Sequence, residues 1–282
     1  MDKIDFSNDW VDKSLPYISI SQILGLLSEP FDRDGVAQKT FDKNYNNPES
    51  QYFKKTKDEI IAMWEAKGAE SCRYGQLLDD YIGIVLEGTE DDKEIYELDN
   101  DVDGDARLNG LVTSFNKFLE QIKSNPEIKY IDREKTIYYN AGDFNVKGRF
   151  DALFYNEKTN KWIVIDWKSS GTIDIVTNRW TKNLLGAAKQ FPALNWYTYT
   201  MQLYFYKTAL LNHYLPEGTK EEDVDVCIVN LPGNIFKTYK AAFNYDKKLM
   251  DDIFKFGYKK NCLLYKKKSW TFASLLLFIV CN

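Results

Sequence analysis

The spacing of apolar residues changes at about residue 126 of this 282-residue chain, and that change limits the folds it can adopt. Before it, apolar residues recur at helical spacing, as Ile60, Met63 and Trp64 do. From residue 128 onward, apolar and polar residues alternate in short runs that end in turn-forming residues, which is the pattern of β-strands. Helices followed by strands and further helices predict an α/β or α+β fold, with a central mixed sheet flanked by helices.

The same patterns place the individual elements. Helices are expected over residues 19–27, 56–88 and 105–123, with a polar loop reaching to about residue 52 and with Gly68 and Gly75 dividing the second helix. Ser19 or Ser21 is the expected cap of the first helix. The later elements are strands over residues 128–139, 144–155 and 161–170, a helix over 193–214, strands over 224–231 and 235–243, and a helix over 245–260.

These elements group into three regions: a helical N-terminal region over residues 1–125, a core of strands and helices over residues 126–262, and an apolar tail over residues 263–282. The apolar run from Trp270 to Cys281 is too short to span a bilayer as a helix. We expect the tail to pack on the core, with a peripheral membrane contact as the alternative, and we expect no membrane partner.

Charge is distributed unevenly between the two halves. Residues 1–125 carry 14 Lys and Arg against 26 Asp and Glu, whereas residues 126–282 carry 23 against 16. A basic half in an acidic protein indicates a polyanionic partner. The single histidine, His213, argues against zinc fingers and His-based triads. The four cysteines include no closely spaced pair and no signal peptide precedes them, so we expect an intracellular protein of the cytoplasm or nucleoid.

Two carboxylates and a lysine lie on neighbouring predicted strands. Asp166 and Lys168 are two residues apart, so they project to the same side of their strand, and a short turn allows Asp151 to lie beside Asp166. Two such carboxylates form an oxygen-rich site for Mg²⁺ or Mn²⁺, and a nearby lysine can orient water or neutralise phosphate charge. A structural Asp–Lys pair is the alternative. As a side chain on the solvent side of a strand, Lys168 is expected to contribute little to folding.

Four segments resemble, in order, the motifs of the PD-(D/E)XK nuclease superfamily and, within it, of the RecB-type exonucleases, which include phage exonucleases and the mitochondrial genome maintenance exonuclease. WEAKGAESCRYGQLLDDYI is similar to the helix that ends in Gly-x-x-x-His, and KGRFDALF to the Gly-x-x-Asp strand. VIDWKSS is similar to the Asp-x-Lys strand, and MQLYFYKTAL to the Gln-x-x-x-Tyr helix. The resemblance covers residues 57–210 and implies a restriction-endonuclease-like core preceded by a helical region that supplies one active-site helix.

The resemblance also implies roles for individual residues. Asp151, Asp166, Lys168, Gln202 and Tyr206 take the catalytic positions; the metal ligands are Asp79, Asp151, Asp166 and the main-chain carbonyl of Trp167. Asp79 departs from the family, which usually has histidine there, and neighbouring Asp80 is the alternative if the register is shifted. Glu134 resembles a recurrent supporting glutamate.

Further residues are candidates for nucleic-acid contacts. Ser169 and Ser170 follow the lysine and carry hydroxyls that can bind phosphate. Lys182 and Lys189 lie on the long segment from Gly171 to Pro192, among aromatic residues that can stack on bases.

The function expected from these features is hydrolysis of DNA phosphodiester bonds with Mg or Mn as cofactor, by an exonuclease acting on single strands or frayed ends. The partners expected are DNA with free ends and proteins of replication or recombination. Three alternatives are open: a structure- or sequence-specific endonuclease of the same superfamily, a non-catalytic nucleic-acid-binding protein that retains the fold, and an enzyme that has lost activity.

Overall fold

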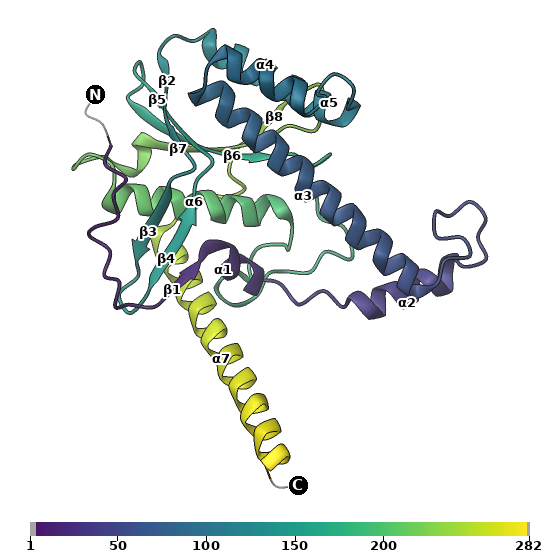
Figure 1. Cartoon of the computed structure of the whole chain (residues 1–282). Coiled ribbons are helices and arrows are strands. Elements are labelled where there is room, and N and C mark those ends of the chain that lie inside the picture. The colour runs from purple at the N-terminus through teal and green to yellow at the C-terminus, as the bar shows by residue number, and fades with distance from the viewer. Residues whose placement is uncertain (1–3, 281–282) are drawn as a thin grey trace. The chain divides into compact units, whose positions relative to one another are not determined.

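The computed structural model describes residues 4–280, with side chains described as far as residue 264 (Figure 1). Its elements, in chain order, are β1 (Tyr17–Ser19), α1 (Ile20–Leu26), α2 (Arg33–Asn44), α3 (Lys57–Glu87), α4 (Glu90–Asp99), α5 (Ala106–Lys123), β2 (Ile128–Arg133), β3 (Thr136–Asn140), β4 (Asn145–Arg149), β5 (Ala152–Asn156), β6 (Lys161–Lys168), η1 (Gly186–Ala188), α6 (Asn195–His213), η2 (Glu221–Asp223), β7 (Val224–Asn230), β8 (Lys237–Tyr239) and α7 (Lys247–Val280).

The chain forms two compact units. Unit 1 comprises residues 1–29, 116–232 and 236–282 and contains all the strands; unit 2 comprises residues 30–115 and 233–235 and is helical. The positions of the two units relative to one another are not determined. Residues 1–29, which the sequence analysis places in the helical N-terminal region, contribute β1 and α1 to unit 1.

Unit 1 is an α+β structure with two mixed sheets flanked by helices. The smaller sheet has the order β1-β4-β3, with β1 parallel and β3 antiparallel to β4. The larger sheet has the order β2-β5-β6-β7-β8, in which only β6 and β7 run parallel. The expectation of mixed sheet and flanking helices is confirmed, but the expectation of one sheet is wrong.

Two sheets form because the first two predicted strands are each interrupted. Residues 128–139 divide into β2 and β3 at Glu134, whose φ is +53°, and residues 144–155 divide into β4 and β5 at Phe150 and Asp151. A non-glycine residue with positive φ is uncommon and carries strain, which leaves the strand without a regular partner at that point. The hairpin therefore bends at matching positions, where Glu134 N–H donates to the Asp151 carbonyl over 3.4 Å, and passes from one sheet to the other.

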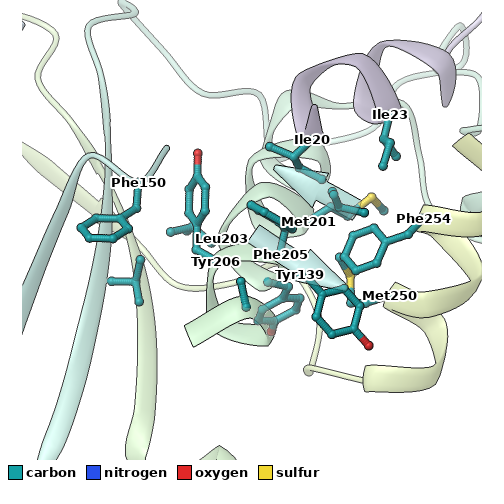
Figure 2. Packing of buried hydrophobic residues seen from close by; sticks show 14 of the residues in the cluster. Ile20, Ile23, Tyr139, Phe150, Met201, Leu203, Phe205, Tyr206, Met250 and Phe254 are labelled. Atoms are coloured by element: carbon teal, nitrogen blue, oxygen red, sulfur yellow. The ribbon is translucent and has the colours of Figure 1, made fainter. Parts of the chain in front are cut away.

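Helix α6 is the crossover that makes β7 parallel to β6, as such a connection requires. It packs on β3, β6 and β7, and its residues from Thr200 to Leu210 are almost all buried. Figure 2 shows Met201, Leu203 and Phe205 in the resulting core, which α1 and α7 also enter. Gly148 of β4 lets α6 approach closely, because a Cβ there would lie 2.5 Å from Phe205 Cε1.

The helices of unit 2 differ from the expectation in two places. The predicted polar loop contains α2, which Asp32 caps and which buries only Ala37, so its sequence shows little apolar periodicity. The predicted break at Gly68 and Gly75 is also wrong, because α3 runs unbroken over 31 residues behind a Thr56–Glu59 capping box. A glycine costs a helix about 1 kcal/mol relative to alanine, which a helix of this length can absorb.

The C-terminal helix is longer than predicted. Helix α7 begins at Lys247 and continues to Val280, whereas the sequence pattern predicts that it ends near residue 260. The predicted packing of the apolar tail concerns side chains that lie outside the described residues. Among the described residues, no helix is both long and apolar enough to cross a membrane. Ser19 is confirmed as the cap of α1, where its Oγ accepts from Gln22 N–H at 3.1 Å.

Candidate active site

Asp151 and Asp166 come together where β5 and β6 pair. Ala152 is opposite Ile165 in this antiparallel register, which places Asp151 alongside the end of β6. The Oδ2 atom of Asp151 accepts a hydrogen bond of 2.7 Å from the main-chain N–H of Trp167. Asp166 is fully buried. The prediction that these two carboxylates are neighbours is therefore confirmed.

Lys168 completes a charged group inside this part of the sheet. Its Nζ lies 2.6 Å from Asp166 Oδ2 and 4.5 Å from the centre of the Tyr199 ring, and only 19% of its side chain is exposed. Asp166 and Lys168 project to the same side of β6, as the sequence spacing predicts. The expectation that Lys168 is on the solvent side is wrong, because α6 brings Tyr199 over it.

The electrostatics of the group favour a bound cation. Burial, and then the nearby Asp166 carboxylate, raises the pKa of Asp151 well above its usual value. Burial also raises the pKa of Asp166, against the opposing effect of Lys168. Burial disfavours the charge of Lys168, yet the two aspartates together raise its pKa. Two carboxylates and one ammonium leave a negative charge in a desolvated place.

The donor atoms fit Mg²⁺ or Mn²⁺. The Oδ1 atom of Asp166 is buried and accepts no hydrogen bond from the described residues, so it is oriented for a ligand other than a protein donor. The N–H and C=O of one strand residue point to the same side. The carbonyl of Trp167 therefore points to the side on which its N–H meets Asp151, the direction that its predicted role requires. Hard cations of this kind take carboxylate and carbonyl oxygens.

Gln202 and Tyr206 share one face of α6 and contact each other. The amide Nε2 of Gln202 donates to the Tyr206 hydroxyl over 2.7 Å. Burial, followed by the charges of Asp166 and Asp151, raises the pKa of Tyr206 well above its usual value, so this phenol keeps its proton. Both residues line a cavity of about 370 Å³ together with Asp151. The structure thus brings together all five residues predicted to be catalytic, in unit 1.

The same cavity contains residues that the sequence analysis did not select. Lys147 and Arg149 line it, and the Nε of Arg149 lies 2.6 Å from Glu134 Oε2. Glu134 also contributes to the raised pKa of Asp151. The signal was present in the sequence, since residues 147, 149 and 151 alternate along one predicted strand and so share a side of it, although the structure ends β4 at Arg149.

Asn230 is a second residue that the sequence analysis missed. It lies beside Lys168 in the parallel register of β6 and β7 and is fully buried. Its Oδ1 is 3.3 Å from Ser170 Oγ, and its Nδ2 has no hydrogen-bond partner among the described residues. No local pattern marks this asparagine, because only the pairing of β7 with β6 places it at the site.

Asp79 lies on α3 in unit 2, so its role as a further metal ligand stays a prediction. The neighbouring Asp80 accepts a hydrogen bond of 2.8 Å from Gln76 on the same helix. Within the described part of unit 1, no group of three His, Cys, Asp or Glu side chains is arranged to hold a metal ion. Unit 1 by itself therefore supplies a pair of carboxylates.

The four residues predicted to bind nucleic acid are located as follows. Ser169 and Ser170 follow β6 directly, and Ser170 contacts Asn230. Lys182 is exposed and forms an ion pair of 2.5 Å with Glu29, while Lys189 is exposed at the end of η1. Neither lysine lines the cavity beside Asp151.

Comparison with known proteins identified no relative of this chain. No protein-family model matches the chain, and no curated protein is similar to it in sequence. The function is therefore inferred from the chemistry of the site residues.

Proposed function

We propose that this protein is a metal-dependent nuclease that hydrolyses phosphodiester bonds of DNA. One observation supports the proposal above the others: Asp151 and Lys168, both half-buried, form a charged group with the fully buried Asp166, and Asp151 lines a solvent-reaching cavity with Gln202 and Tyr206. Hydrolysis of a phosphodiester needs a Lewis acid, an activated water and a cation near the phosphate. The buried group contains residues suited to each of these needs.

In this proposal, unit 1 offers Asp151, Asp166 and the carbonyl of Trp167 as ligands of Mg²⁺ or Mn²⁺, and Asp79 of α3 is the further ligand that the resemblance implies. When bound, the ion supplies a polarised phosphate oxygen and a water of lowered pKa. Asp166 holds the ammonium of Lys168 at 2.6 Å, which fixes its position. From there Lys168 can donate to a water or to a phosphate oxygen as negative charge develops.

Gln202 and Tyr206 have a supporting role in this proposal. The Tyr206 phenol remains protonated and accepts from Gln202, so its own proton is available for a group in the cavity. Tyr199, above Lys168, excludes water from one side of the ammonium. These residues bind and orient; none acts as a covalent nucleophile, and water is the attacking group.

The finer assignment follows the resemblance described above. We propose a restriction-endonuclease-like core and an exonuclease acting on single-stranded or frayed DNA ends, in an intracellular setting with replication or recombination proteins as partners. The order of strands in the larger sheet supports such a core: the antiparallel strands β2, β5 and β6 precede the crossover helix α6, and β7 then pairs in parallel with β6.

The test is digestion of end-labelled single and double strands, with either end blocked, in Mg²⁺ and in Mn²⁺. We expect stepwise loss of nucleotides from an open end and no cleavage in EDTA. Asp166→Asn keeps the size of the side chain but removes its charge, and we expect it to lose hydrolysis. Asp225→Asn is the matched control, because Asp225 is an exposed carboxylate on β7 that pairs with Lys161 at 3.1 Å.

The alternatives predict different results. Cleavage of a circular single strand indicates an endonuclease. DNA binding with no turnover in either metal indicates a binding protein that retains the fold, and it refutes the proposed activity. Equal hydrolysis by Asp166→Asn and Asp225→Asn also refutes it, because the buried carboxylate is then unnecessary.

A further inference from the structure

The cavity beside Asp151 continues along β4 as a line of cationic and aromatic side chains. Lys147 and Arg149 are two residues apart on this strand, so they lie on one side of it, roughly 6.6 Å apart. The parallel neighbour β1 places Ser19 opposite Lys147, and the Lys147 Nζ lies 3.9 Å from the centre of the Tyr17 ring. The order along the strand is therefore Tyr17 and Lys147, then Arg149, then Asp151.

Each of these side chains is available to a ligand. The Tyr17 side chain is among the exposed large apolar groups, at 60% exposure, although it lies at the start of a strand. Lys147 has no carboxylate within ion-pair distance among the described residues, and its positive charge is shared only with the Tyr17 ring. An exposed aromatic ring beside an unpaired ammonium is the combination with which proteins hold unpaired bases and their phosphates.

Arg149 has a carboxylate partner that a phosphate can replace. Its side chain is 62% exposed, so water already competes for the guanidinium in its ion pair with Glu134, whose side chain is 19% exposed. A phosphodiester accepts two parallel hydrogen bonds from a guanidinium, which makes it a strong competitor for Arg149. Lys147 and Arg149 line the cavity together with Asp151, so a phosphate on its way to the site meets their positive charges.

We propose that Tyr17, Lys147 and Arg149 form the track on which a nucleic-acid single strand approaches Asp151, with a base stacked on Tyr17 and phosphates bound by Lys147 and Arg149. The purpose of this track rests on the proposed nuclease function. The binding of a single strand by these three residues does not depend on hydrolysis. It assigns the contacts nearest the site to the β1–β4 surface of unit 1. A duplex is a poorer ligand there, because its bases are already stacked.

The experiment measures the affinity of the full chain for a fluorescein-labelled single-stranded DNA, by anisotropy in Ca²⁺ or EDTA, between about 50 and 200 mM salt. Each lost phosphate contact on a single strand lowers the slope of log K against log salt by roughly 0.7. We expect Lys147→Ala with Arg149→Ala to lower the slope by roughly 1.4. The matched control is Lys158→Ala with Lys220→Ala, which removes the same charge from two exposed lysines that precede β6 and β7, at the ends of these parallel strands away from Lys168.

Tyr17 is tested by a pair of variants. We expect Tyr17→Ala to weaken binding of the single strand by about fivefold or more, since base–aromatic stacking has at least that effect, and Tyr17→Phe to bind as the wild type does. The track is overturned if the salt slope changes equally in the Lys147→Ala, Arg149→Ala variant and in the Lys158→Ala, Lys220→Ala control. Equal affinity for a blunt duplex and a single strand also overturns it. These outcomes are separate from the nuclease proposal, which depends on turnover in Mn²⁺ and can fail while the track is confirmed.

Discussion

Replacing Lys168 by alanine tests the description of the site as a buried, cation-requiring group. The change removes the ammonium that lies 2.6 Å from the fully buried Asp166, and only 19% of that lysine side chain is exposed. Removing one partner of a buried ion pair costs about 3–5 kcal/mol, because the other charge stays buried and uncompensated. We take the lower value of about 3 kcal/mol because Lys168 is partly hydrated, which corresponds to a fall in Tm of roughly 6–12 °C.

The expected loss depends on pH in a defined direction. Burial raises the pKa of both Asp151 and Asp166 above 3.8, so the folded protein holds protons that the unfolded chain has already released. Stability of the metal-free protein therefore falls as pH rises from about 4 through the raised pKa of the pair. Alanine at position 168 removes a cation that lowers both pKa values, so the destabilisation should be smaller at pH 5 than at pH 8.

The assay is thermal unfolding in EDTA at both pH values, repeated with Mn²⁺. We expect Mn²⁺ to recover part of the lost Tm in the Lys168→Ala variant, because an ion bound only by the folded state stabilises it. Lys161→Ala on the same strand is the control, since its ion pair with Asp225 is exposed and worth about 0–1 kcal/mol. Equal Tm values for the two variants in EDTA would refute the reasoning, because Lys168 would then compensate no buried charge.

Four further predictions concern other residues. Asp79→Ala should weaken Mn²⁺ binding measured by titration, and Asp79→His should retain part of it; wild-type affinity in Asp79→Ala with a loss in Asp80→Ala would mean that the register is shifted. Lys182→Ala with Lys189→Ala should flatten the salt dependence of DNA binding, and an unchanged slope would mean that the long loop does not contact DNA. Gly148→Ala should lower the free energy of unfolding by about 1–3 kcal/mol, because its Cβ meets buried Phe205, and urea denaturation measures this. Burial lowers the pKa of His213 below 6.5, so stability should be lost as pH falls below about 6.5, and a His213→Phe variant should lack that dependence.

Local patterns were sufficient wherever one strand or helix determines the relation between two residues. Asp166 and Lys168 share a side because side chains alternate along β6, and Gln202 meets Tyr206 because residues four apart share a helix face. The turn at residues 156–160 brings β5 back along β6, which is why Asp151 could be expected beside Asp166. Each of these relations involves few residues between the partners, so little can intervene.

Local patterns failed where the backbone departs from its average behaviour. The positive φ at Glu134 divides one predicted strand, and the matching break at Asp151 turns one predicted sheet into two. That departure places Arg149 and Asp151 at one cavity and brings Glu134 to the guanidinium of Arg149. The alternation of apolar residues continues through the bend, so this periodicity does not predict the bend. Helix α2 was missed for the opposite reason, because a helix that buries one alanine has no apolar periodicity to detect.

The sequence by itself determined which residues we propose for the chemistry: the Asp-x-Lys strand, the second aspartate and the Gln-x-x-x-Tyr helix. Only the tertiary structure decided what surrounds them. Pairing of β7 with β6 brings Asn230 beside Lys168 from 62 positions away in the chain, and the packing of α6 buries a lysine that the strand pattern assigns to solvent. The physical reason is that periodicity along a strand fixes which side a residue faces, whereas the elements that cover that side are chosen by contacts between distant parts of the chain.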